Sequence, residues 1–515
     1  MMWPVAPSIY VQIFAVSLGV LLVSVGRLRK KRSTPPGPDG LPFIGNLLDL
    51  PKREAWQVYL DWSKHYDSDI LSMKVPGAQF FILNSAKVIQ DLLVKKANIY
   101  SNRPHSTLLK DLIGITWLIP FMNNGERWRE HRRLFRREFE TAEASAVNKT
   151  HEVVAARKLL RRLLSSADHE GEIRLAVVDA IMSTTYGISL EDLNHPFVTG
   201  PEGANAIFAD VARGEYIVDV FPLLRYLPTW VPGTVFHAIA KKGKALADSL
   251  LMDPYGQVQA EMANGTACSS VASRFLSADQ DGTVSETEKE ALRNVCGNAY
   301  LGGADTIVCS LYSFVIAMAL YPDVQKKAQI SLDAVLEGGR LPEFEDFLDL
   351  PYLSAVINEV LRWHPVTPFA NYHASTEDDA YEGYHIPKGA IMIPNTWAIL
   401  HDERIFGPDT DKFDPERFLK ADGSLRLDLS EIDVVFGFSK RACPGRVMAK
   451  DTLWIMMASI LTAYTIADPF DMDGNVLTAE SHLEYTTALV SFPPHIRVSF
   501  KPRIAESVIH ESLSE

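Results

Sequence analysis

The alternation of hydrophobic and polar positions predicts a chain that is mainly α-helical. Between about residues 123 and 365, hydrophobic residues recur with the period of an amphipathic helix. The clearest stretches cover residues 128–139, 151–164, 241–252, 286–320 and 352–363, and the same period returns at 450–464. Short runs at 70–75 and 80–83 predict a small β-sheet, and the Pro, Gly and Asp content of 371–420 predicts short strands and loops. We therefore expect a mainly α fold with small β-sheets.

One hydrophobic stretch near the N-terminus has a different character. Residues 4–25 carry no charge and are mostly Val, Ile, Leu, Phe and Ala, enough for a helix that spans the ~30 Å hydrocarbon core of a bilayer. Basic residues follow between Arg27 and Arg32 and none precedes, so the positive-inside rule places the rest of the chain in the cytosol. A cleaved signal peptide would need the basic residues first, and a buried core helix is the remaining alternative.

The chain is therefore divided into three parts. Residues 1–26 form a single transmembrane anchor, residues 27–42 form a basic and proline-rich hinge, and residues 43–515 form one large domain. The domain contains no low-complexity linker or repeat that would divide it, and 47% of the chain is hydrophobic, enough for a large core. A net charge of −13 argues against a nucleic-acid binder. The four cysteines are too few to cross-link a secreted chain of this length, which favours a reducing compartment.

The sharpest local motif is the segment 436–445, FGFSKRACPG, which leads into an apolar helix near Val447. The dipole of that helix and the neighbouring cations should lower the pKa of the Cys443 thiol and favour the thiolate, the form that binds a soft metal or a haem iron. On these grounds alone, a buried inert cysteine is an equally good interpretation. The segment resembles the cysteine-ligand signature of the cytochrome P450 family. It matches that signature at Phe436, Arg441, Cys443 and Gly445, whereas Ser439 replaces the usual glycine.

A second motif lies inside the helix predicted at 286–320. Gly302 and Gly303, followed by Asp305 and Thr306, stand where an apolar core helix would prefer Ala or Leu. The glycines would leave room for dioxygen, and the acid-alcohol pair would relay protons. The motif resembles the family's oxygen-activation motif, except that Ile307 replaces a threonine or serine common in the family.

Three further resemblances concern the cofactor's surroundings. Glu359 and Arg362, with Arg417 downstream, match a structural Glu-Arg-Arg cluster of the family. Trp128 and Arg132 match a helical pair that contacts a haem propionate, and Arg441 and His373 are expected to do the same. The residues before His373, Asn371 and Tyr372, depart from the family's usual Pro-His.

These motifs cover nearly the whole chain, and the resemblance implies the P450 fold with haem b bound through Cys443. It implies a monooxygenase that oxidises a lipophilic small molecule, in the style of fungal secondary-metabolite enzymes with terpenoid, polyketide or indole substrates. By position in the family, the substrate pocket is expected to include Tyr300, Ala304, Thr367, Phe369 and Thr487.

The source of electrons is expected to be another protein. The sequence has no Gly-x-Gly-x-x-Gly fingerprint for a dinucleotide, so the electrons should come from NADPH through NADPH-cytochrome P450 reductase, a separate flavin protein. A basic face for this acidic partner is predicted from Arg127, Arg129, Arg133, Arg136, Arg137, Lys440, Arg446 and Lys450. The expected location is the endoplasmic reticulum membrane. The alternatives are a haem-thiolate isomerase, dehydratase or peroxygenase that needs no reductase, and a non-catalytic haem protein.

Overall fold

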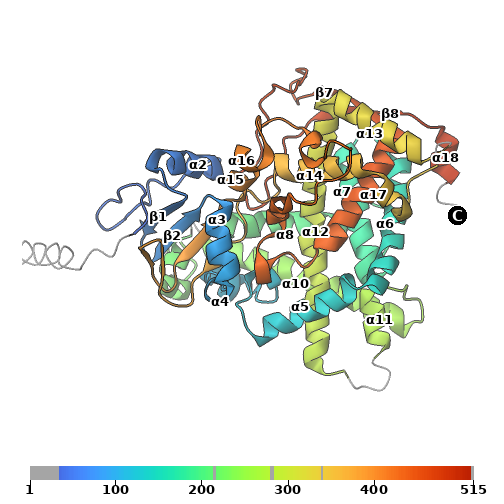
Figure 1. Ribbon diagram of the computed structural model, residues 1–515. Helices are drawn as coiled ribbons and strands as arrows, with labels where there is room; N and C mark the ends of the chain where they lie inside the picture. Colours follow the sequence, from blue (N-terminus) through green and yellow to red (C-terminus); the bar gives the residue numbers. More distant parts are fainter. Residues whose placement is uncertain (1–33, 213–215, 279–283, 338–339, 512–515) are drawn as a thin grey trace, which may run out of the picture.

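The computed structural model describes residues 34–212, 216–278, 284–337 and 340–511. A small β region formed by the N-terminal strands and a strand from residues 391–394 lies beside a larger helical body, as expected from the sequence (Figure 1). In Figure 1 the blue strands β1 (Ile70–Val75) and β2 (Ala78–Leu83) lie at the left, and the long yellow helix α12 (Glu286–Leu320) runs through the centre of the body. The predicted transmembrane anchor lies outside the described residues.

The remaining longer helices are α2 (Ala55–Tyr66), α5 (Glu126–Phe139), α6 (Ala142–Leu163), α7 (His169–Tyr186), α8 (Pro196–Ala212), α10 (Phe236–Ala263), α13 (Pro322–Val335), α14 (Pro351–Trp363) and α17 (Arg446–Ala463). The shorter helices are α3 (Ala86–Ile89), α4 (Ala97–Tyr100), α9 (Ile217–Val220), α11 (Val271–Ser277), α15 (Thr396–Leu400), α16 (Glu403–Phe406) and α18 (Glu506–Glu511). The remaining strands are β3 (His373–Ala374), β4 (Asp379–Tyr381), β5 (Tyr384–Ile386), β6 (Ile391–Pro394), β7 (Tyr464–Phe470) and β8 (Arg497–Pro502).

Helix α12 has the bounds that its hydrophobic period predicts. It begins with a capping box, in which the Ser285 hydroxyl accepts from the Glu288 amide and the Glu288 carboxylate accepts from the Ser285 amide. Among the described residues it is the one helix long and apolar enough to cross a membrane, but 83% of its apolar window is buried by the surrounding protein. It is therefore the core helix of the fold, packed against α5, α7, α8, α10, α14 and α17.

The main sheet joins distant parts of the sequence in the order β1-β2-β6-β3. Strands β1 and β2 form the predicted antiparallel hairpin, turning at Gly77 with a φ of 81°. Strand β2 pairs in parallel with β6, and β3 pairs with β6 in the antiparallel direction. This pairing fixes His373 of β3 next to the N-terminal part of the chain.

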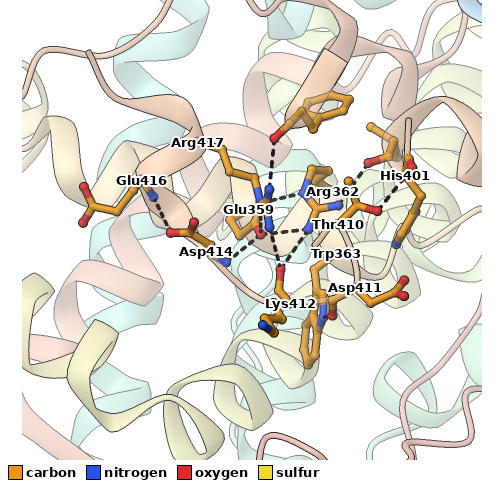
Figure 2. A network of polar contacts seen from close by, with 12 residues as sticks. Glu359, Arg362, Trp363, His401, Thr410, Asp411, Lys412, Asp414, Glu416 and Arg417 are labelled. Atoms are coloured by element: carbon orange, nitrogen blue, oxygen red, sulfur yellow. Dashed lines mark hydrogen bonds and ion pairs between the residues drawn. The ribbon is translucent and has the colours of Figure 1, made fainter. Parts of the chain in front are cut away.

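A fully buried charge cluster joins α14 to the segment that follows β6 (Figure 2). Glu359 accepts two hydrogen bonds from Arg362, at 2.6 and 2.8 Å, and both side chains have 0% exposure. Arg417 adds a contact at 3.3 Å, and the backbone amide of Asp414 donates to the same carboxylate at 2.7 Å. Burial raises the pKa of Glu359, and the two arginines and this amide oppose that rise. The Glu-Arg-Arg cluster expected from the sequence is present.

The two arginines also hold backbone carbonyl groups in place. Arg362 donates to the carbonyls of Leu400 and Lys412, and Arg417 donates to those of Phe406, Pro408, Asp409 and Lys412. The indole of Trp363 donates to the Asp411 carbonyl at 2.8 Å. The cluster therefore fixes residues 400–417 against α14, with the donors and acceptors of a loop satisfied by side chains.

We expect Glu359→Ala to lower the free energy of unfolding by about 3–5 kcal/mol, because it leaves two buried guanidinium groups without their carboxylate. The control is Glu126→Ala, which removes a 75%-exposed carboxylate from an ion pair with Arg129 and should cost less than about 1 kcal/mol. Urea unfolding followed by circular dichroism measures both. Equal losses in the two variants would contradict a structural role for the cluster.

Candidate haem-thiolate site

The segment around Cys443 folds into a tight loop held by its own backbone. The Cys443 amide donates to the Phe436 carbonyl at 2.6 Å, and the Arg441 amide donates to that of Phe438 at 2.9 Å. Gly437 has a φ of 81° and Ser439 a φ of 48°, so both lie in the left-handed region. Because only glycine adopts this conformation freely, the serine costs about 1 kcal/mol. The backbone geometry explains why glycine is usual at this position.

The thiol of Cys443 faces a large cavity just before the N-terminus of α17. The Gly445 amide and the guanidinium of Arg132 act to lower the thiol pKa, but burial outweighs them and the pKa is raised. This direction differs from the one expected from the helix dipole and the cations, because the surrounding protein desolvates the thiol although the residue is exposed to the cavity. Arg132 also donates to the Ala442 carbonyl, which ties α5 to the loop.

Beside the cysteine loop, buried cations gather without a carboxylate partner. The guanidinium of Arg441 stacks over the Trp128 ring at 4.4 Å, and its Nε donates to the Ser101 carbonyl at 2.7 Å. Burial and the nearby Arg132 lower the pKa of Arg441 to about 10. Arg103 lies close enough to Arg441 for mutual repulsion, which together with burial lowers its own pKa. Burying positive charge of this kind is costly unless an anion pairs with it.

Three buried donors of this wall fit a haem. Nη1 and Nη2 of Arg441 and Nε1 of Trp128 are buried and have no hydrogen-bond partner among the described residues. Carboxylate groups such as the two propionates of haem b are the acceptors that such donors need. The Cys443 sulfur faces the same cavity and would supply a soft ligand for the haem iron. The donor set therefore fits haem b.

His373 lies in the same wall. Its Nδ1 is 2.6 Å from the Tyr100 carbonyl, and the ring is 2% exposed. Burial, Arg103 and Arg441 lower its pKa, so it is neutral at pH 7 and donates from Nδ1. This bond leaves Nε2 for other contacts.

Asp305 and Thr306 occupy the wall formed by α12. Arg174 of α7 donates to one carboxylate oxygen of Asp305 at 2.6 Å, and Asn205 of α8 donates to the other at 2.8 Å. The Thr306 hydroxyl donates to the Gly302 carbonyl at 2.8 Å. Both side chains line the cavity that contains Cys443. The acid and the alcohol therefore face one chamber, with the acid fixed from two neighbouring helices.

The two glycines of the motif have different surroundings. A Cβ atom on Gly302 would meet nothing within 4 Å, whereas one on Gly303 would lie 2.8 Å from Cδ1 of Ile181 in α7. Gly302 thus borders open space, and Gly303 permits close packing of α12 against α7. Both glycines line the cavity, and the expectation that they leave room for dioxygen stays a prediction.

The cavity has a volume of about 990 Å³ and brings together most of the residues singled out from the sequence. The predicted residues that line it are Trp128, Arg132, Asp305, Thr306, Thr367, His373, Phe436, Arg441, Cys443 and Gly445. Residues from five separate parts of the chain therefore meet at one site.

Four predicted pocket residues do not line this cavity. Tyr300 and Ala304 lie one helical turn apart on another face of α12, where the Tyr300 hydroxyl donates to the Phe197 carbonyl at 2.6 Å. Phe369 packs against Trp56 and Tyr59 in the cluster beside the sheet. Thr487 does not line the cavity, although Thr486 and residues 488–490 do. These expectations are corrected, because motif position does not reveal which way a side chain points.

Several polar contributors were not predicted, four of which have a clear role in the cavity wall. Arg103, Arg174 and Asn205 line the cavity, as does Asn298, whose amide fixes the wall at residues 117–119 by bonding the Trp117 carbonyl and the Ile119 amide. A signal existed for Arg174, a lone charge next to the apolar run 175–178. Nothing local in the sequence marks the other three.

Comparisons with known proteins agree with the geometry. The chain matches the Cytochrome P450 family model over residues 35–486. It is 44% identical to the cytochrome P450 monooxygenase eriA of Hericium erinaceus, over 94% of this chain and 92% of that protein. It is 38% identical to the cytochrome P450 monooxygenase ple1 of Rhodocybe pseudopiperita, over 93% of this chain and 91% of that protein. It is 36% identical to the tryptamine 4-monooxygenase of Psilocybe cyanescens, over 93% of this chain and 95% of that protein. The chain with this cysteine loop, cation wall and acid-alcohol pair belongs to the cytochrome P450 family and is a P450 monooxygenase.

Proposed function

We propose that the protein inserts one oxygen atom of O2 into a lipophilic small molecule, using electrons from NADPH that a separate flavin reductase delivers. The observation that carries this proposal is the single cavity that joins the Cys443 thiol, the unpartnered donors of Arg441 and Trp128, and the Asp305–Thr306 pair. Neither a simple haem carrier nor an isomerase needs the acid-alcohol pair. The similarity to fungal monooxygenases supports a role in secondary metabolism.

Different residues of the cavity have different roles in the proposed reaction. When bound, the haem would supply dioxygen binding and the oxidising chemistry. Cys443 would hold the iron, and Arg441, Trp128 and His373 would hold the propionates. The Thr306 hydroxyl, already donating to Gly302, keeps its lone pairs free to accept and pass a proton within the cavity. Asp305 would supply that proton.

The walls around this chemistry favour an apolar substrate. Apolar side chains from residues 118–121, from α8 and from residues 488–490 line the chamber. Such walls bind by shape and desolvation. A terpenoid, polyketide or indole skeleton would suit them, and the relative named for tryptamine supports the indole class.

A basic face for the reductase is supported by the structure, although carboxylates reduce its charge. Five carboxylates pair with seven of the eight predicted cations, and Lys440 bonds to the amide of Asn98. The paired carboxylates are Glu126, Glu138, Glu140, Glu290 and Asp433. The cations stay in excess, which favours an acidic partner surface.

Membrane attachment is the further part of the proposal. Besides the apolar residues 4–25, the structure exposes two groups of large apolar side chains. The first group is Leu41, Phe43, Leu47 and Leu48, and the second is Ile217, Val220, Phe221, Leu223, Tyr226, Leu227, Trp230 and Val235. Exposed apolar side chains gathered in this way mark protein or membrane contacts, and the cytosolic face of the endoplasmic reticulum would offer them lipid.

The cofactor assignment predicts the absorption of the reduced protein with carbon monoxide. The wild type should give a Soret band at the long wavelength typical of thiolate-ligated haem, and Cys443→His should move it to the shorter wavelength typical of imidazole. Cys268→Ser is the control, since Cys268 is exposed and does not line the cavity. An imidazole-type band in folded wild-type protein would remove Cys443 as the ligand.

The relay assignment predicts that Thr306→Ala uncouples electron flow from oxygen insertion. With reductase and NADPH, the peroxide released per NADPH should rise several-fold, because the hydroxyl that passes protons is missing. Ser310→Ala is the matched control, since Ser310 lies one turn further along α12 in the same cavity. An unchanged peroxide yield in Thr306→Ala would reject the relay. A wild type that consumes no NADPH with reductase would reject the electron source.

The membrane assignment predicts that a chain lacking residues 1–33 still binds vesicles through its exposed apolar groups. In that chain Trp230→Ser should weaken binding to phosphatidylcholine vesicles about tenfold, since burying one large apolar side chain contributes roughly 1.5–3 kcal/mol. Leu348→Ser is the control, because Leu348 is 86% exposed but outside both groups. Equal vesicle affinity of the two variants in a sedimentation assay would contradict this assignment.

A further inference from the structure

Two polar side chains line the cavity without a hydrogen-bond partner. They are the hydroxyl of Thr367 and the amide of Asn371, and neither bonds to another residue that the structure describes. Asn371 is instead bonded through its backbone carbonyl, which accepts from Arg103 at 2.7 Å. Both side chains are half-buried, and each can donate as well as accept a hydrogen bond. They therefore offer unused hydrogen-bonding groups to a molecule that enters the chamber.

The backbone holds these two side chains in place. Both belong to one short segment, residues 366–371, which is bonded at its two ends. The Val366 carbonyl accepts from the Ser491 amide at 2.8 Å, and the Asn371 carbonyl accepts the arginine bond just described. Between the ends, bonds to residues 394–397 fix the backbone at positions 368 and 370. Because the segment is fixed before a ligand arrives, little conformational entropy is lost when the ligand bonds to it.

The other amide and hydroxyl side chains of the cavity are already used by the protein or by solvent. Six of them donate to a carbonyl or carboxylate oxygen of the protein, and these are Asn205, Asn298, Thr306, Ser310, Tyr312 and Thr486. Asn194 and Thr199 are exposed, so water can bond to them. Thr367 and Asn371 thus differ from the rest, because a lipophilic ligand that fills the chamber would remove water from them.

We propose that the substrate already carries a neutral oxygen function, a hydroxyl or carbonyl group, and that Thr367 and Asn371 are the specificity-determining residues that bind it. The inference rests on the proposed monooxygenase reaction. A bare hydrocarbon would leave both side chains desolvated and unpaired, which a site built for hydrogen bonding disfavours strongly. A neutral oxygen fits because neither side chain is charged. A reaction that places oxygen on the skeleton must therefore come before this one and supply its substrate.

The test measures binding to the haem-loaded, full-length protein by equilibrium dialysis, with neither reductase nor NADPH present. Three pairs of probes cover the proposed skeletons, and each pair is an alcohol with its parent compound. The pairs are farnesol with farnesene, dodecan-1-ol with dodecane, and indole-3-ethanol with 3-ethylindole. The alcohol preference of a variant is the dissociation constant of the parent divided by that of the alcohol. Differences in water solubility within a pair cancel when this ratio is compared between variants.

Thr367→Val keeps the shape of the side chain but removes its hydroxyl. In at least one pair it should lower the alcohol preference about tenfold, the factor expected for one lost hydrogen bond. Thr367→Ser should restore most of the preference, and Asn371→Leu should lower it in the same direction. Thr199→Val is the matched control, because the same change at an exposed hydroxyl of the same cavity should leave the ratio at the wild-type value.

The outcomes separate substrate recognition from stability and from cofactor binding. The carbon monoxide spectrum of each variant reports an intact site, and if Thr367→Val does not fold, Thr367→Ser and Asn371→Leu still give the ratio. Haem loss from Asn371→Leu at an unchanged alcohol preference would assign that amide to the cofactor and overturn its part in the inference.

Two results would overturn the inference as a whole. One is an equal alcohol preference of the wild type and Thr367→Val in all three pairs. The other is failure of all three alcohols to bind the wild type, because a cavity of about 990 Å³ has room for molecules of this size. Neither result bears on the electron source, since binding needs no electrons. A wild type that binds the alcohols but consumes no NADPH with reductase would overturn the proposed electron source alone.

Discussion

The buried carboxylate of Glu359 can stay charged only while two arginines and a backbone amide face it. Removing a charge from water costs several kcal/mol per ion, which only well-placed partners offset. Those partners come from α14 and from residues 400–417, so neither segment can move without exposing an unpaired charge to an apolar interior. The chain runs on from this fixed segment to the loop at Phe436–Gly445, and the position of Cys443 depends on it. A charge cluster that never touches the reacting atoms thus sets where the reaction takes place.

Around Cys443, the residues that the structure describes do not meet the requirement that a buried charge has a partner. Arg103 and Arg441 are buried, yet no carboxylate among the described residues pairs with either, and the two Nη atoms of Arg441 lack partners. Such a wall destabilises the protein until an anion completes it. The propionates of a haem would pair with these arginines as the Glu359 carboxylate pairs with Arg362. Haem binding would therefore be coupled to folding by electrostatics, in addition to a bond from Cys443 to the iron.

The sequence predicted what depends on short spacing and failed where distant segments meet. The bounds of α12 followed from its apolar period, and the cysteine loop and the Glu359 cluster were expected from the resemblance to family motifs. The start of α6 was expected at residue 151, but the helix begins at Ala142, nine residues earlier and capped by Thr141, where the apolar period is weak. Arg174 and Asn205 could not be connected to Asp305, because they are 131 and 100 residues away in the chain. The raised pKa of Cys443 depends on burial, which no local pattern contains.

One helix serves two opposite requirements of this enzyme class. A lipophilic substrate binds best to dry apolar walls, whereas the reaction must receive protons from water. Helix α12 meets both requirements, because Gly302, Asp305 and Thr306 border the chamber while the Asp305 carboxylate is also bonded towards α7 and α8. Adjacent residues on a helix point about 100° apart, so the neighbouring helices can hold Asp305 while Thr306 bonds to a carbonyl of α12 itself. An acid directly followed by an alcohol therefore gives a mainly apolar chamber two polar groups that are fixed from different sides.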